Sequence, residues 1–166
     1  VDVDSELLVK NVTVTKDPSH GVLNIDSESG QITYTPQSNY FGSDGFSYAV
    51  KDEQSLMSNI APVNLTIKSI NDAPIANNDT AVILEDTLHN INVLGNDSDV
   101  DGSLDESSIE IVNAPLQGIA IASQGVISYT PNANSNGEDT FTYRVKDDLG
   151  EWSNAARVSL TVTPVN

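Results

Sequence analysis

The sequence contains no cysteine, and this absence removes several kinds of chemistry. Disulfides, thiolate nucleophiles and cysteine-based zinc sites are all excluded. No apolar stretch is long enough to span a bilayer, and no signal peptide is visible. We therefore expect no membrane insertion, and the localisation has to be inferred from the type of domain.

Basic residues are also scarce. Seven Lys and Arg stand against 24 Asp and Glu, which gives a formal net charge of −17. Nucleic acid is excluded as a partner, because neutralising phosphates needs clustered Lys and Arg, and an anionic membrane surface is disfavoured. Such self-repulsion destabilises a compact state unless counter-ions bind. The acidic side chains therefore serve solubility alone, or they bind divalent cations.

Helical periodicity is missing too. No window of twelve or more residues carries a convincing apolar stripe at the i, i+3, i+4 and i+7 positions. Val, Ile and Thr dominate the apolar set, and β-branched residues favour pleated, half-buried strands. The sequence predicts an all-β protein.

What the sequence does contain is an internal repeat. Residues 30–71 align without a gap on residues 125–166, a shift of 95 positions, with 20 identities in 42 positions. Further upstream the match continues at a shift of 97, which pairs Asp2, Asp4 and Gly21 with Asp99, Asp101 and Gly118. The chain is therefore two copies of one unit, which we place at residues 1–72 and 73–166.

Alternating apolar residues and turn signals predict seven short strands in the second copy. They fall at residues 79–84, 90–94, 108–112, 118–122, 126–130, 139–146 and 156–163. This pattern is typical of a Greek-key sandwich of the immunoglobulin-like class. The first copy is expected to lack the opening two strands, either because the chain is cut through a repeat or because those strands are disordered or supplied by another chain.

Several motifs together resemble the cadherin family. "SINDAP" at residues 69–74 resembles the cadherin linker with its first Asp replaced by Ser69, and "SDVD" at residues 98–101 resembles the Asp-x-Asp loop. With "YTP" and "GxDxFxYxVKD", the chain is most similar to the cadherin-like tandem repeats of large secreted bacterial adhesins. The resemblance implies tandem cadherin-like sandwiches on a cell surface, stiffened by Ca²⁺ between domains.

The order of strands in a sandwich brings two acidic loops to the end where the linker enters. Ca²⁺ binds six to eight hard oxygens, which such loops and a linker supply. The predicted ligands come from the linker, from both loops and from the far end of copy one: Asn71, Asp72, Asp97, Asp99, Asp101, Asp147, Asp148 and Asp44. "DVDS" at residues 2–5 is the same loop of the first copy.

Bland interpretations apply to other acidic residues. "DSDVDG" matches the first half of an EF-hand loop, but Ser108 replaces the closing Glu and no helices flank it. A single Asp, such as Asp139, is better explained as a turn residue.

No poised nucleophile, acid or base predicts an enzyme. Residues His20 and His89 have no matched partners in the other copy, and no serine lies in a G-x-S-x-G elbow. The favoured function is a Ca²⁺-stiffened spacer or adhesive module, secreted or on the cell surface. Its candidate partners are neighbouring repeats, a surface protein, a polysaccharide or a second copy.

The alternative function is a carbohydrate-binding module of a secreted polysaccharide-active protein. It requires an exposed aromatic platform, for which only Trp152 and Tyr40 are plausible.

Overall fold

The computed structural model describes residues 7–165, and the chain divides into two units. Unit 1 is Val1–Ile70 and unit 2 is Asn71–Asn166, so the division falls two residues before the one expected from the repeat. The reason is local, because the Asn71 side chain is hydrogen-bonded to Asp147 of unit 2.

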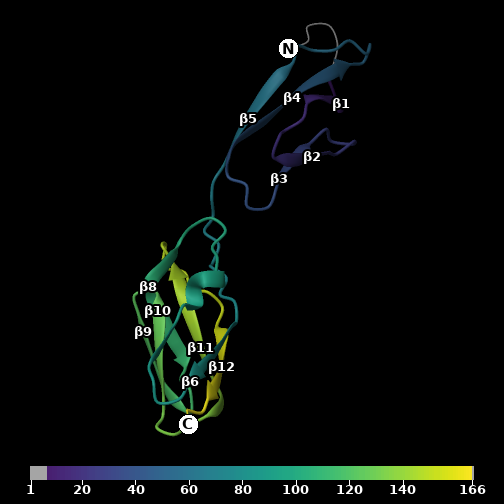
Figure 1. The fold of residues 1–166 in the computed structure, drawn as a ribbon. Coiled ribbons are helices and arrows are strands. Elements are labelled where there is room, and N and C mark those ends of the chain that lie inside the picture. Colours follow the sequence, from purple (N-terminus) through teal and green to yellow (C-terminus); the bar gives the residue numbers. More distant parts are fainter. Residues whose placement is uncertain (1–6, 166) are drawn as a thin grey trace. The chain divides into compact units, whose positions relative to one another are not determined.

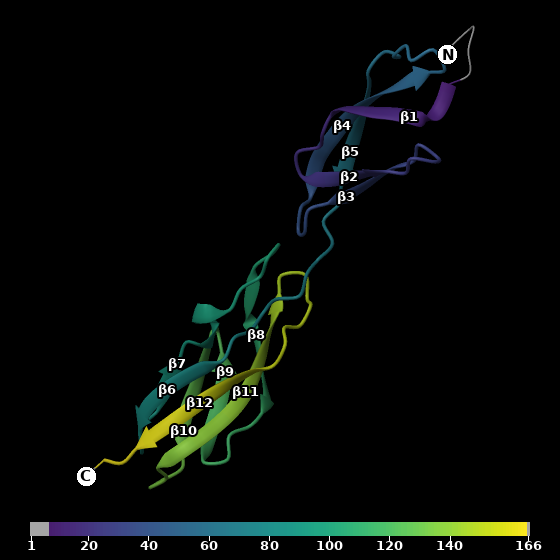
Figure 2. The same ribbon diagram turned by 90° about the vertical axis from the view of Figure 1, so that its right-hand side faces the viewer.

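Unit 2 is a seven-stranded sandwich (Figures 1 and 2). One sheet has the order β6-β12-β11-β8 and the other has the order β7-β10-β9. The elements are β6 (Asp79–Leu84), β7 (His89–Ile91), a 3₁₀ turn η1 (Val93–Asn96), β8 (Leu104–Asn113), β9 (Gly118–Ser123), β10 (Val126–Pro131), β11 (Gly137–Asp147) and β12 (Ala156–Thr163). The predicted fold class is confirmed.

The core of unit 2 lies between these two sheets. Phe141, Tyr143 and Val145 of β11 are at most 1 % exposed, and Val158 and Leu160 of β12 are completely buried. These are the residues that strand alternation predicted to point inward. The second sheet contributes Ile91, Ile127 and Tyr129 to the same cluster.

Unit 1 contains five strands (Figures 1 and 2). They are β1 (Leu7–Lys16), β2 (Gly21–Ile25), β3 (Ile32–Pro36), β4 (Gly42–Asp52) and β5 (Ala61–Ile67). One sheet has the order β1-β4-β5, and β2 pairs with β3. The repeat shift maps these strands on β8 to β12, so among residues 7–165 nothing in unit 1 corresponds to β6 or β7. The expected lack of two strands is confirmed for the described residues.

A hydrogen-bonded Tyr–Asp pair recurs in both units. The Tyr129 hydroxyl donates to Asp139, which also accepts from the backbone N–H groups of Leu116 and Gln117. Gly118 leaves room for the ring, since a Cβ there would lie 2.4 Å from the Tyr129 ring. Burial opposes ionisation of Asp139, yet these hydrogen bonds hold its pKa below the usual value. The prediction that Asp139 is a structural turn residue agrees with these contacts.

Candidate metal-binding loops

Unit 2 holds its linker by hydrogen bonds to two loops. The Asn71 side-chain amide donates to Asp147 Oδ2 over 2.7 Å, and the Asp72 N–H donates to Asp101 Oδ1 over 3.3 Å. After Pro74, Ile75 exchanges two backbone hydrogen bonds with Ser98. The linker, the loop before β8 and the loop after β11 therefore meet at one end of the unit, as the strand order predicted.

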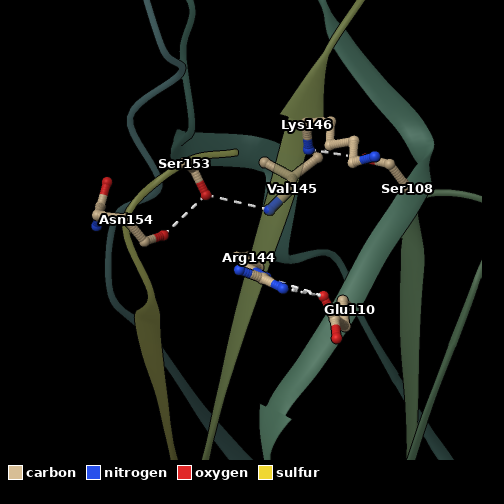
Figure 3. Close-up of polar contacts among 7 residues, drawn as sticks. All are labelled: Ser108, Glu110, Arg144, Val145, Lys146, Ser153 and Asn154. Atoms are coloured by element: carbon tan, nitrogen blue, oxygen red, sulfur yellow. Dashed lines mark hydrogen bonds and ion pairs between the residues drawn. The ribbon is translucent and has the colours of Figure 1, made fainter. Parts of the chain in front are cut away.

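The loop after β11 has a fixed geometry. The Ser153 hydroxyl accepts from the Val145 N–H and donates to the Asn154 carbonyl, and the Lys146 N–H donates to Ser108 Oγ (Figure 3). The Asn154 side chain in turn accepts from the Ala76 N–H. These bonds position Asp147 and Asp148 on a scaffold that is held from both sides.

Asp147 is an anchor inside this loop. It is 2 % exposed, and its Oδ1 accepts from the N–H groups of Leu149 and Glu151 while its Oδ2 accepts from Asn71. Burial opposes ionisation, but the bond from Asn71 and the loop amides hold the pKa of Asp147 below its usual value. Both oxygens have partners in the protein, so Asp147 stabilises the loop and the linker.

Asp99 differs from Asp147, because one of its oxygens is buried without a partner. Asp99 Oδ1 accepts from the N–H groups of Asp101 and Gly102, each over 3.2 Å, whereas Oδ2 is inaccessible and has no hydrogen-bond partner. Leaving such a carboxylate oxygen unsatisfied is costly, so a proton or a cation is expected at this atom.

A second carboxylate lies beside the unpaired oxygen. A Cβ on Gly102 would lie 2.6 Å from Asp148 Oδ1 and 3.1 Å from Asp99 Oδ2, so the two carboxylates converge on this glycine. Asp148 Oδ1 also accepts from the Ser103 N–H. Asp101 adjoins the same place through its bond from Asp72. This group of hard oxygens suits Ca²⁺ better than a soft metal.

Asp97 belongs to a different cluster from Asp99. Its Oδ1 accepts from the Asn77 N–H and its Oδ2 accepts from the Tyr143 hydroxyl, which also lies 3.2 Å from Asp79. Burial raises the pKa of Asp97, and burial together with repulsion from Asp97 raises the pKa of Asp79 to about 6. The structure thus divides the predicted ligands of unit 2 into two groups. The pairing of Asp97 with Asp79 through Tyr143 had no signal in the sequence pattern.

Asp44 makes the same contacts in unit 1 as Asp139 makes in unit 2. It accepts from the N–H groups of Ser19 and His20 and from the Tyr34 hydroxyl. Burial opposes ionisation, but these bonds hold the pKa of Asp44 well below its usual range. These contacts favour a structural role, and its role as a metal ligand stays a prediction. Residues 2–5, the expected loop of the first copy, lie outside the described residues.

The aromatic side chains expected for a sugar platform are occupied within the protein. The Arg144 guanidinium lies 4.1 Å from the centre of the Trp152 ring and the Lys146 ammonium lies 4.8 Å from it. Tyr40 is stacked on His20 with ring centres 4.0 Å apart. Since sugars bind open ring faces, these contacts disfavour a carbohydrate platform.

The described residues do not form a complete metal cage. Between residues 7 and 165, no three His, Asp or Glu side chains converge closely enough to hold a metal ion as they stand. The donor chemistry at Asp99, Asp101 and Asp148 nevertheless fits Ca²⁺, because one buried carboxylate oxygen lacks a partner. These three residues are the ones that would hold such an ion.

The fold defines this protein as a pair of immunoglobulin-like or cadherin-like β-sandwich modules. The chain belongs to the Bacterial Ig domain family, whose model matches residues 1–66 and 71–161. Modules of this class are structural or adhesive parts of extracellular proteins. No curated protein matches the chain.

Solved structures of similar fold include cadherins and polysaccharide hydrolases. Chicken VE-cadherin EC1-2 is 15 % identical with a TM-score of 0.47, over 98 % of this chain and 89 % of that one. Drosophila N-cadherin EC1-3 is 12 % identical with a TM-score of 0.45, over 99 % and 57 %. The endo-fucoidan hydrolase MfFcnA4 is 17 % identical with a TM-score of 0.41, over 93 % of this chain and 23 % of its own length. At these scores the similarities carry no weight for function.

The described part of the chain holds no helix suited to a membrane crossing. Nothing helical between residues 7 and 165 has the length and apolar character that spanning a bilayer requires.

Proposed function

We propose that the chain is a non-catalytic, Ca²⁺-binding module of a large secreted or cell-surface bacterial protein, where tandem sandwiches act as a spacer and support adhesion. The observation that carries the proposal is the buried, unpartnered Oδ2 of Asp99 beside the Asp148 carboxylate. A divalent cation would satisfy that oxygen and neutralise part of an acidic end. The net charge of −17 supports the same conclusion.

Asp99, Asp101 and Asp148 would hold the ion, and Asp72 lies next to them in the linker. Binding would draw these carboxylates together and fix the linker residues against unit 2. Bending between successive repeats would then be restricted, so that an array projects its tip away from the cell. Extracellular Ca²⁺ modules bind with dissociation constants of roughly 10⁻⁴–10⁻³ M, so the stiffness would follow the Ca²⁺ concentration outside the cell.

Calorimetric Ca²⁺ titration of the metal-free chain tests this proposal. Asp99→Asn should weaken binding by at least about tenfold, since it removes a charged ligand at the unsatisfied oxygen. Glu110→Gln is the matched control. It removes one acidic charge from the same unit, but Glu110 forms an exposed ion pair with Arg144 (Figure 3).

The control should bind Ca²⁺ within about twofold of the parent chain, because an exposed ion pair contributes little. Equal weakening in both variants would mean that only overall charge matters, and it would contradict a site at Asp99.

A further inference from the structure

Each sheet of unit 1 ends in a strand whose counterpart in unit 2 is paired. In unit 2, β12 pairs with β6 in parallel and β10 pairs with β7 in antiparallel orientation. The counterparts in unit 1 are β5 and β3, which end the sheets β1-β4-β5 and β2-β3. Figure 2 shows β6 lying along β12, whereas no strand of the described residues lies along the outer side of β5. One whole side of the unit 1 sandwich is therefore open.

The open side leaves the inner face of unit 1 incompletely buried. Val63, Leu65 and Ile67 of β5 are half-buried, although their counterparts Val158, Leu160 and Val162 are at most 4 % exposed. The same holds for Ile32 and Tyr34 of β3, whose counterparts Ile127 and Tyr129 are completely buried. The two units differ in this respect at residues of the same apolar type.

Unit 2 shows what covers these positions. Ile83 of β6, Ile91 of β7 and Val93 of η1 are all less than 9 % exposed and belong to the core cluster. Burying one such side chain contributes about 1.5–3 kcal/mol. Unit 1 lacks this contribution along its open side, and its strand edges also present unpaired backbone groups there.

We infer that the open side of unit 1 is a binding site for a strand pair of the β6–β7 type, donated by a neighbouring repeat. This is β-strand addition, in which backbone hydrogen bonds give affinity and alternate side chains give specificity. The repeat shift sets the register, since the pairs Val158–Asp79, Leu160–Ala81 and Val162–Ile83 of unit 2 map on Val63, Leu65 and Ile67. The donor is thus a segment with small or branched apolar residues at alternate positions.

Further contacts of unit 2 have matching acceptor positions in unit 1. The Asn154 side chain clamps the backbone of Ala76 through both its N–H and its carbonyl, and its counterpart Asn59 is exposed. Unit 1 departs from the pattern at one place. Arg157 donates its N–H to Asn78, whereas its counterpart Pro62 has no N–H to donate. The docked strand would lack that hydrogen bond and keep the others.

A second copy of this chain is the poorer donor. The β6–β7 segment of each copy is already packed in its own unit 2, where Ile83, Ile91 and Val93 form part of the core. Releasing them would expose that core, which costs more than the open side of unit 1 returns. A strand pair that is free to dock, from a repeat of the same kind, is the occupant that the burial pattern favours.

The test mixes the full chain with a synthetic peptide of residues 73–97, in EDTA and about 0.15 M salt to screen the acidic charges. The expected result is one peptide per chain, with amide exchange at residues 63–67 slowed by roughly tenfold or more while unit 2 is unchanged. The control peptide carries Ile83→Asp and Ile91→Asp, which place charges at the inward positions, and it should not bind. Because EDTA is present, the outcome is independent of the Ca²⁺ proposal.

Equal binding of both peptides, or binding of neither, would overturn the inference. So would a chain that dimerises without peptide and thereby excludes it, because the occupant would then be a second copy. A covalent version removes any dependence on peptide solubility. The same 25 residues joined ahead of Val1 by a flexible Gly/Ser linker should raise the melting temperature of unit 1, and an unchanged melting temperature would also overturn the inference.

Discussion

At the scale of single residues, unit 2 contains a hydroxyl surrounded by more acceptors than it can serve. The Tyr143 oxygen lies within 3.3 Å of Asp97, Asp79 and the carbonyls of Val93 and Asn77. One hydroxyl carries one hydrogen, so it can donate to only one of these four acceptors. A second proton on a carboxylate relieves the conflict, which agrees with the raised pKa of Asp79.

This arrangement predicts a pH dependence with a definite sign. The pKa of Asp79 is about 6 in the folded state against 3.8 ordinarily, so between these values the folded state keeps a proton that the unfolded state has lost. This contribution to stability is present below about pH 4 and is lost as the pH rises through about 6. Asp79→Asn should therefore stabilise unit 2 at pH 7 in EDTA, by on the order of 1 kcal/mol after solvent screening.

The measurement is denaturant unfolding at pH 4 and at pH 7, followed by the fluorescence of Trp152, the single tryptophan of the chain. The advantage of Asp79→Asn should vanish at pH 4, where the parent carboxyl is protonated in both states. Glu110→Gln serves as the control and should show no such change. An advantage of equal size at both pH values would contradict the shared proton.

At the scale of strands, the same core leucine occurs in a closed and in an open sandwich. Leu160 is completely buried under β6, whereas Leu65 at the matching position is half-buried. Leu160→Ala should cost about 3 kcal/mol and Leu65→Ala about 1 kcal/mol, because truncating a side chain costs more where its surroundings are more closely packed. Trp152 fluorescence reports unfolding of unit 2, and amide NMR signals report unit 1. Equal costs would mean that unit 1 is as well packed as unit 2.

Much of the strand pattern could be predicted from the sequence. The ranges 79–84 and 156–163 were predicted without error, because clean alternation and turn residues bound them. β8 begins at Leu104, four residues earlier than predicted, since Asp105 looks like a loop residue but pairs with Lys146 of β11. Tertiary pairing thus overrides the local signal. The strand predicted at 90–94 is replaced by β7 and the turn η1.

The candidate site was predictable as a meeting of loops and not in its internal contacts. Strand order alone brings Asp99, Asp101 and Asp148 to the linker. It does not show that Asp147 already has partners for both oxygens, or that Asp97 turns toward Tyr143. The structural contacts of Asp44 were within reach of the sequence, because the repeat maps it on Asp139.

At the scale of the whole molecule, a net charge of −17 opposes compactness. Folding gathers carboxylates at the linker end of unit 2, where the buried Asp99 oxygen has no partner. Ca²⁺ binding to the folded state and not to the unfolded chain would stabilise unit 2 by mass action. A monovalent salt would screen the same charges without satisfying that oxygen.

The most direct measurement is the thermal unfolding of the 166-residue chain in EDTA and in millimolar Ca²⁺ at equal ionic strength. At about ten times the dissociation constant, Ca²⁺ should add roughly 1.4 kcal/mol, which raises the melting temperature of unit 2 by several degrees. Asp99→Asn should abolish the increase, and Glu110→Gln should retain it. A parent chain that melts at the same temperature in EDTA and in Ca²⁺ would contradict the account.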